Sequence, residues 1–164
     1  MKQQINFELF HSTVDATIKP FVFELHSYLM ENSCNASYYE RKSGYVVRYQ
    51  YGEPLRDFIF FSFKKQGLFI NIRGEHNEKY SDFLDTLPVE MIKQIEKASV
   101  CHRIVSNGCS PVCIGYDFYI GDVHYQKCVN SCFNFLITDI SKPYIKSFVE
   151  HELSQRDGSG RVMR

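Results

Sequence analysis

Residues 56–73, RDFIFFSFKKQGLFINIR, decide the fold of this chain. Aromatic and branched residues dominate both halves of the stretch, and residues of these types favour β-strands. The loop Lys64–Gly67 separates the two halves and ends in a glycine, which adopts the positive φ that a hairpin turn needs. We therefore predict two antiparallel strands joined by this loop, with both of their faces largely buried.

Two more strands are predicted before this hairpin. In YYERKSGYVVRYQY, residues 38–51, alternate positions from Tyr45 onward are apolar or aromatic, and a turn falls near Ser43–Gly44. Tyrosines in such strands usually belong to the core and bring their hydroxyls to its rim. They can also cup a hydrophobic or aromatic ligand, so Tyr45, Arg48 and Tyr49 form a candidate ligand pocket in which Arg48 pairs with a carboxylate.

Helical periodicity flanks these strands. Residues 15–32 place apolar side chains at the three-and-four spacing of an amphipathic helix, and residues 77–99 and 141–155 show the same spacing. Residues 115–128, GYDFYIGDVHYQKC, return to a strand pattern with a hairpin turn at Gly121–Asp122. FNFLITD then predicts one more strand.

The predicted fold class is therefore α+β, an antiparallel sheet with segregated helices in the order α-β-β-β-β-α-β-β-β-α. No repeat or linker divides the chain, so we expect a single domain over residues 1–155 and a flexible tail over residues 156–164. Within the domain, a cysteine-rich lobe is expected at about residues 100–133.

Composition limits the partners that we expect. Lys and Arg together number 19, as do Asp and Glu, so the formal net charge is zero. A neutral chain has no long-range field that attracts nucleic acid or an anionic membrane, so neither is expected as a partner. No apolar segment is long enough for a signal peptide or a membrane span, which predicts a cytoplasmic protein. The partner that remains is a small molecule or a protein of unknown identity.

Five of the six cysteines fall within residues 101–132, CHRIVSNGCSPVCIGYDFYIGDVHYQKCVNSC. Clustered thiols in the cytoplasm usually bind a metal or carry out redox chemistry. Zinc takes four soft ligands in a tetrahedron, and a turn at Pro111 brings two of these thiols together. We therefore predict a structural zinc whose four thiolates leave no open position for catalysis. The predicted ligands are Cys101, Cys109, Cys113 and Cys128.

Cys132 is the alternative ligand. If the strand here is regular, Cys128 and Cys132 lie about 13 Å apart and cannot share one ion. If a turn separates them, Cys132 replaces Cys101. Two other interpretations stay open, which are packing of the thiols as small apolar groups and a reversible redox or metal-sensing pair. Further substitutes as ligands are His102 and His124.

The remaining candidates favour a structural interpretation. Cys34 follows a predicted helix C-terminus, where the helix dipole raises the pKa of a thiol. Glu75 and Glu78 lie beside His76, and a solvated helix entry accounts for this group. No pair of carboxylates, histidine motif or glycine-rich loop indicates catalysis, so an enzyme is not expected.

Three segments resemble the small bacterial YdhG-like domains, which are linked to frataxin-like iron handling. These segments are the helix FVFELHSYLMEN, the strands YYERKSGYVVRYQ and the hairpin FIFFSFKKQGLFINI. The cysteine-rich segment also looks like the C-terminal part of uncharacterised Firmicutes proteins. Iron binding in frataxins uses an acidic helix ridge, whereas the first long helix here carries only Asp15, Glu24 and Glu31.

The sequence thus predicts a cytoplasmic α+β binding or interaction module that a tetracysteine zinc site stabilises. A thiol redox or metal sensor that uses the same cysteines is the alternative function.

Overall fold

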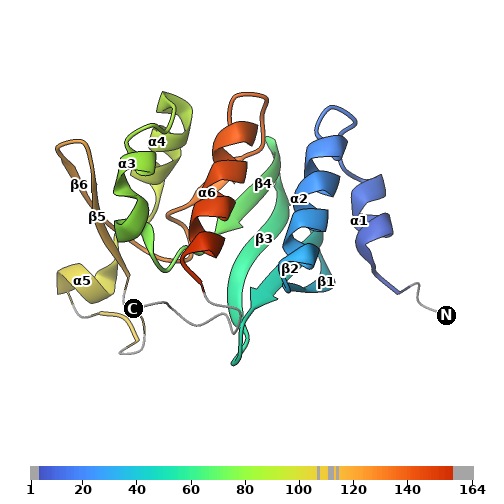
Figure 1. Ribbon diagram of the computed structural model, residues 1–164, viewed down its shortest axis with the longest axis horizontal. Helices are drawn as coiled ribbons and strands as arrows, with labels where there is room; N and C mark the ends of the chain where they lie inside the picture. The colour runs from blue at the N-terminus through green and yellow to red at the C-terminus, as the bar shows by residue number, and fades with distance from the viewer. Residues whose placement is uncertain (1–3, 107, 111–112, 114, 157–164) are drawn as a thin grey trace.

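The computed structural model describes residues 4–106, 108–110, 113 and 115–156. Within these ranges the chain forms a five-stranded antiparallel sheet, a two-stranded sheet and a layer of helices in front of the larger sheet (Figure 1). The predicted α+β class and the predicted order of the strands are confirmed.

The larger sheet has the strand order β1-β2-β3-β4-β7, and every neighbouring pair is antiparallel. The hairpin predicted from RDFIFFSFKKQGLFINIR is β3–β4, and Gly67 has the expected positive φ of 141°. The strands of this sheet are β1 (Asn35–Arg41), β2 (Gly44–Tyr51), β3 (Arg56–Lys64), β4 (Gly67–Ile72) and β7 (Asn134–Leu136).

The helices divide into an N-terminal pair and a later group. The predicted helix at residues 15–32 forms as α2 (Lys19–Glu31), with Pro20 in its first turn. A short helix, α1 (Phe7–Ser12), precedes it and was not predicted, because six residues are too few to show a helical period. The later helices are η1 (Asn77–Tyr80), α3 (Ser81–Leu84), α4 (Val89–Lys97), α5 (His102–Ser106) and α6 (Lys142–Ser154).

The cysteine-rich region forms a separate small lobe, which we call the hairpin lobe. It consists of α5, β5 (Tyr116–Ile120) and β6 (Val123–Lys127), and its strands join at the predicted turn, where Gly121 has φ +57°. One face of the hairpin is apolar, because Tyr116, Phe118 and Tyr125 are all buried. Phe118 packs against Phe133 at a ring distance of 5.5 Å, which joins the lobe to the main core.

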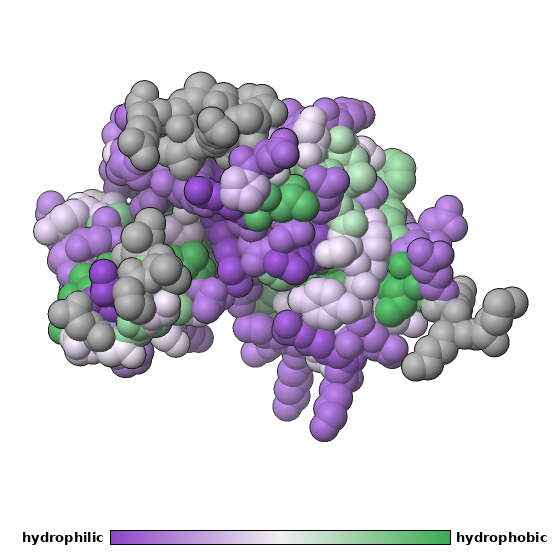
Figure 2. All heavy atoms as spheres, turned by 90° about the horizontal axis from the view of Figure 1, so that it is seen from below, coloured by the Kyte–Doolittle hydropathy of each residue, from purple (hydrophilic) through white to green (hydrophobic). Residues whose placement is uncertain are grey.

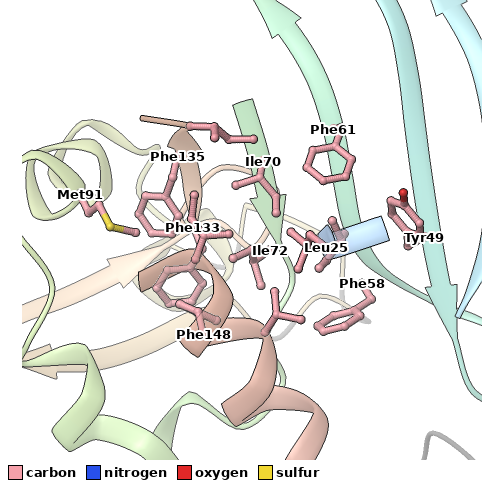
Figure 3. Packing of buried hydrophobic residues seen from close by; sticks show 14 of the residues in the cluster. Leu25, Tyr49, Phe58, Phe61, Ile70, Ile72, Met91, Phe133, Phe135 and Phe148 are labelled. Atoms are coloured by element: carbon pink, nitrogen blue, oxygen red, sulfur yellow. The ribbon is translucent and has the colours of Figure 1, made fainter. Parts of the chain in front are cut away.

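Aromatic side chains from helices and strands build that core (Figure 3). Phe61 of β3 lies opposite Ile70 of β4, and both side chains are fully buried under the helices. Phe148 of α6 packs edge-on against Phe133 at a ring distance of 4.9 Å. Burial of an aromatic side chain of this size contributes on the order of 3 kcal/mol, so these rings hold the helix layer to the sheet.

The expected burial of both faces of the β3–β4 hairpin holds for β4, where all residues from Leu68 to Ile72 are buried, but only in part for β3. No described helix covers the rear face in Figure 1. Phe60 and Ser62 are half-buried there and Lys64 is exposed. Phe60 lies opposite Asn71, so a polar residue of β4 shares this face.

None of the described helices is long and apolar enough to cross a membrane.

Candidate functional site

A polar pocket of about 830 Å³ lies where the hairpin lobe meets the end of the large sheet. The start of β3, the chain after β4 and the start of β5 form its walls. Figure 2 views the molecule from this end and shows hydrophilic side chains gathered between the lobe at the left and the main body. We call this the polar pocket, and its main lining side chains are Arg56, Asp57, Arg73, Glu75, Tyr116 and Asp117.

Ion pairs across the strands fix the charged groups of the polar pocket. Arg56 donates to Glu75 at 3.0 Å. Asp57 accepts from Arg48 at 2.6 Å and from Arg73 at 3.5 Å. Adjacent strands thus hold these side chains in place before any ligand arrives.

Tyr116 lines the pocket and is 6% exposed. Its hydroxyl has no hydrogen-bond partner among the described residues. Burial raises the pKa of this hydroxyl, the nearby Cys132 and Glu152 raise it further, and the positive charge of Arg73 opposes them. A buried hydroxyl without a partner costs about 1–3 kcal/mol, so a ligand group or a water that bonds to it would recover that energy.

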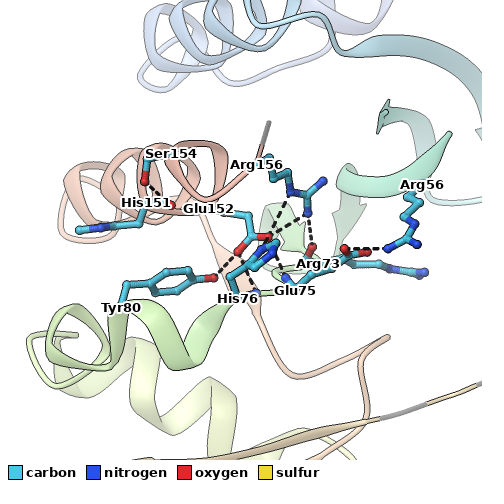
Figure 4. Close-up of polar contacts among 9 residues, drawn as sticks. All are labelled: Arg56, Arg73, Glu75, His76, Tyr80, His151, Glu152, Ser154 and Arg156. Carbon is cyan, nitrogen blue, oxygen red and sulfur yellow. Dashed lines mark hydrogen bonds and ion pairs between the residues drawn. The ribbon is translucent and has the colours of Figure 1, made fainter. Parts of the chain in front are cut away.

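Behind the pocket, a fully buried carboxylate ties α6 to the chain that follows β4 (Figure 4). Glu152 accepts hydrogen bonds from the backbone N–H of Glu75 at 2.8 Å and from the Tyr80 hydroxyl at 2.6 Å. It also accepts from His76 Nδ1 at 2.8 Å and from Arg156 at 3.0 Å. These five residues form what we call the Glu152 network.

The Glu152 network keeps its carboxylate ionised. Burial alone would raise the pKa of Glu152, but the charge of Arg156 and the hydrogen bonds from Tyr80, Glu75 and His76 outweigh it, so the pKa lies below its ordinary value. Burial and the neighbouring carboxylate raise the pKa of Tyr80. The carboxylate of Glu152 is therefore held as the anion of a buried ion pair with Arg156.

The same network sets the path of the main chain along the pocket. Two backbone N–H groups, of Glu75 and His76, bond to Glu152, and Arg156 donates to the carbonyl of Arg73. Gly74 lies so close to the network that a Cβ on it would be 2.6 Å from the Tyr80 hydroxyl. No larger residue fits there without displacing Tyr80.

Sequence reasoning missed this network. We expected His76 and its acidic neighbours at a solvated helix entry, but His76 is 1% exposed and its Nε2 has no partner among the described residues. Arg156, which we placed at the start of the tail, is buried, while residues 157–164 lie outside the described residues. The sequence does contain one signal of this network. Glu152 is a charged residue on the apolar face of its helix, four residues after Phe148.

The candidate ligand pocket of Tyr45, Arg48 and Tyr49 does not form. Successive residues of a strand point to opposite faces, so Arg48 and Tyr49 lie on different sides of the sheet. Tyr49 is fully buried and its hydroxyl bonds to His26 at 2.7 Å. Arg48 does pair with a carboxylate, that of Asp57, but on the face that carries no described helix.

The structure describes all five clustered cysteines as free thiols but not Pro111, which lies outside the described residues. Cys101 is buried, Cys109 is exposed, and Cys113 and Cys128 are partly exposed. Among the described residues, no three or more His, Cys, Asp or Glu side chains form a group that could hold a metal ion. His102 is exposed on α5, and His124 bonds to Asp117.

Strand pairing nevertheless places two of the predicted zinc ligands on the same face of the paired strands. Val100 pairs with Lys127 in an antiparallel bridge. The backbone N–H of Cys101 donates to the carbonyl of Gln126 at 2.9 Å, and the backbone N–H of Cys128 donates to the carbonyl of Ser99 at 2.8 Å. Cys101 and Cys128 are therefore diagonal neighbours on one face, typically about 7–8 Å apart. Gly115 directly precedes β5, and a Cβ on it would lie 2.3 Å from Cys101 Sγ.

Two other cysteines, Cys132 and Cys34, are buried. A turn separates Cys132 from Cys128, because the Cys132 N–H donates to the Cys128 carbonyl at 2.9 Å. Cys132 is fully buried, and burial raises the pKa of its thiol. Burial also raises the pKa of the Cys34 thiol to about 12, so the structural interpretation of Cys34 agrees with its position.

No protein-family model matches the chain, and no curated protein or solved structure matches it significantly. The resemblance to YdhG-like domains stays a prediction from the sequence.

Proposed function

We propose that the protein is a cytoplasmic binding module whose polar pocket holds a small polar molecule with a positively charged nitrogen. The observation that carries the proposal is the Tyr116 hydroxyl, which is buried in the pocket wall without a partner among the described residues. Ion pairs and the Glu152 network fix the surrounding groups, and binding sites are commonly preformed in this way.

The charge of the lining favours a cationic ligand. Arg56 is paired with Glu75, and Arg73 is paired with Asp57. The other charged lining residues are carboxylates, those of Glu78 and Asp117. Hydrogen bonds from His124 and Gln126 lower the pKa of Asp117, which keeps it negative. An amine between these carboxylates would meet a negative field at the mouth and the Tyr116 oxygen at the wall.

Thermal denaturation with simple probes tests this function. Agmatine and spermidine, at about 100 times their Kd, are expected to raise Tm by about 5–10 °C, whereas citrate is expected to leave it unchanged. Tyr116→Phe should reduce the shift. Tyr119→Phe is the matched control, because Tyr119 is 57% exposed on the other face of the same strand. A shift with citrate alone, or an equal shift in Tyr116→Phe, contradicts the proposal.

We also propose that a structural zinc fastens the hairpin lobe, with Cys101, Cys113 and Cys128 among its ligands. Support comes from the diagonal placement of Cys101 and Cys128 and from the contact of Cys101 with Gly115, two residues after Cys113. Because Gly115 and Tyr116 both line the polar pocket, such a site would hold the pocket wall in place. Cys109 supplies the fourth thiolate of the predicted set.

Elemental analysis of purified protein tests the zinc directly. About one zinc per chain is expected, and chelation should lower Tm. Cys128→Ser should abolish zinc binding, whereas Cys34→Ser, the matched change outside the cluster, should not. Protein that is free of metal and keeps its Tm on chelation would rule out this part of the proposal.

A thiol sensor is the alternative function, and the solvent exposure of two of the clustered cysteines favours it. Cys109 is exposed and Cys113 is partly exposed. In this function two thiols form one disulfide while hydrogen peroxide is reduced to two water molecules. Titration of free thiols before and after mild peroxide separates the two functions. A sensor loses two free thiols per chain, whereas a structural zinc site saturated with metal loses none.

A further inference from the structure

The rear face of the large sheet gathers basic side chains that are far apart in the sequence. Strand register places Tyr39 opposite Val46, Arg48 opposite Phe60, and Phe60 opposite Asn71. Since residues directly opposite each other share a face, these side chains lie together on the side without described helices. We call this surface the basic face, and its positively charged members are Arg41, Arg48, Lys64 and Arg73, with Lys97 at the edge.

Charge is strongly segregated on the basic face. Two hollows of about 240 and 410 Å³ lie on it and share Lys64, and the described residues that line them include no carboxylate. Asp57 is the acidic partner nearby, and it is already bonded to Arg48 and Arg73. A net charge of zero describes the whole chain and therefore does not describe this face.

Aromatic rings accompany the cations. The Lys64 ammonium lies 4.7 Å from the ring centre of Phe69, and the Arg73 guanidinium lies 4.8 Å from that of Phe60. At the edge of the sheet the Arg41 guanidinium lies 5.3 Å from the ring of Tyr39. Each of these three rings thus has a positive group beside it.

Amide groups line the floor of the smaller hollow. Asn71 is 7% exposed and donates to the carbonyl of Asn130 at 3.1 Å, but its Oδ1 has no partner among the described residues. Asn134 lies opposite Asn71 and lines the same hollow. An unpaired acceptor beside further amides is suited to hydrogen bonding with the edge of a nucleobase.

We propose that the basic face binds single-stranded nucleic acid, with phosphates on the cations and a base in the hollow floored by Asn71. Aromatic rings and polar groups on a β-sheet are a means by which proteins recognise unpaired bases, and this face carries both, partly or fully buried. A duplex offers no unpaired base to the amides of the hollow. An acidic peptide would match the cations, but it has no base edge to pair with Asn71.

Fluorescence anisotropy with a labelled single-stranded RNA of about 12 nucleotides and mixed sequence tests the proposal. Contact with about four phosphates predicts a slope near −3 for log K against log salt, at about 0.7 per phosphate. Arg41→Glu with Lys64→Glu should weaken binding at least tenfold, since both residues are exposed and line the smaller hollow. Lys79→Glu, an exposed residue on the helix side, is the matched control and should change binding less than twofold.

Two variants at Asn71 test the base contact, and the uncharged Asn71→Leu separates it from charge. Asn71→Asp places a carboxylate in the hollow floor, whereas Asn71→Leu removes the polar group and keeps the size, so both should weaken binding to RNA. An unlabelled RNA duplex and a polyaspartate peptide serve as competitors and are expected to compete at least tenfold less well than the single strand. Equal competition by either one, an unchanged affinity in Arg41→Glu with Lys64→Glu, or absence of binding at about 50 mM salt overturns the proposal.

Discussion

Replacement of Glu152 by glutamine removes the charge at the centre of the buried network and keeps the shape of the side chain. Arg156 then stays positive with its side chain 0% exposed and without a counter-charge. Breaking a buried ion pair in this way costs about 3–5 kcal/mol. The new amide also points donor hydrogens at groups that themselves donate, such as the Tyr80 hydroxyl. We expect the free energy of unfolding to fall by about 3–5 kcal/mol.

Urea denaturation followed by far-ultraviolet circular dichroism measures this loss. With a slope of about 2 kcal/mol per molar urea, the midpoint of unfolding should fall by about 2 M at unchanged slope. The double variant Glu152→Gln with Arg156→Gln removes the stranded charge as well, so it should be more stable than the single variant by about 1–2 kcal/mol. A loss below about 1 kcal/mol in the single variant, or additive losses in the double variant, would refute the reasoning.

Acid provides a second measurement of the same group. The network holds the pKa of Glu152 below its ordinary value of 4.5, so the folded state binds this proton less tightly than the unfolded state does. The resulting stability is present above about pH 4.5 and is lost as the pH falls through the lower pKa of the folded state. The stability difference between the wild type and Glu152→Gln should therefore shrink over that acid range, and a constant difference would contradict the assignment.

Three further predictions concern the core and the hairpin lobe. Gly115→Ala should destabilise the lobe by about 1–3 kcal/mol, since Gly115 has φ +67° and a Cβ would meet Cys101 Sγ, and hydrogen exchange should rise in β5 and β6 but not in β2. Cys34 and Cys132 should react with a thiol reagent at pH 8 only after unfolding, because burial raises the pKa of both thiols; rapid labelling of all six cysteines would contradict this. Phe148→Ala should lower the free energy of unfolding by about 3–5 kcal/mol in urea, since this ring is fully buried, and a loss below about 1 kcal/mol would show that the core closes around the gap.

Local patterns were enough to predict most of the fold. The alternation from Tyr45 to Tyr51 predicted the strand β2, and Gly67 predicted the turn of the hairpin. These features depend on neighbours within a few residues, so a single sequence contains them. The helix α1 shows the lower limit of this reasoning, because its six residues give only one buried position, Phe10.

The candidate site was not predictable in the same way. His76 and Glu152 bond across 76 positions of sequence, so no spacing rule links them. The basic face is likewise composed of single residues from separate strands, and Arg41 and Arg73 meet only after the sheet has formed. A run of lysines would have been visible in the sequence, whereas a cluster made by strand register is not.

The long reach of Glu152 also determines the order in which the domain can assemble. The four strands β1 to β4 pair with their neighbours in sequence, so they can form while the rest of the chain is still being synthesised. The wall of the polar pocket at Glu75 and His76 waits for a partner that the ribosome adds more than 70 residues later. Until then the chain after β4 lacks the carboxylate that fixes it, so the sheet can form before the wall of the polar pocket is in place.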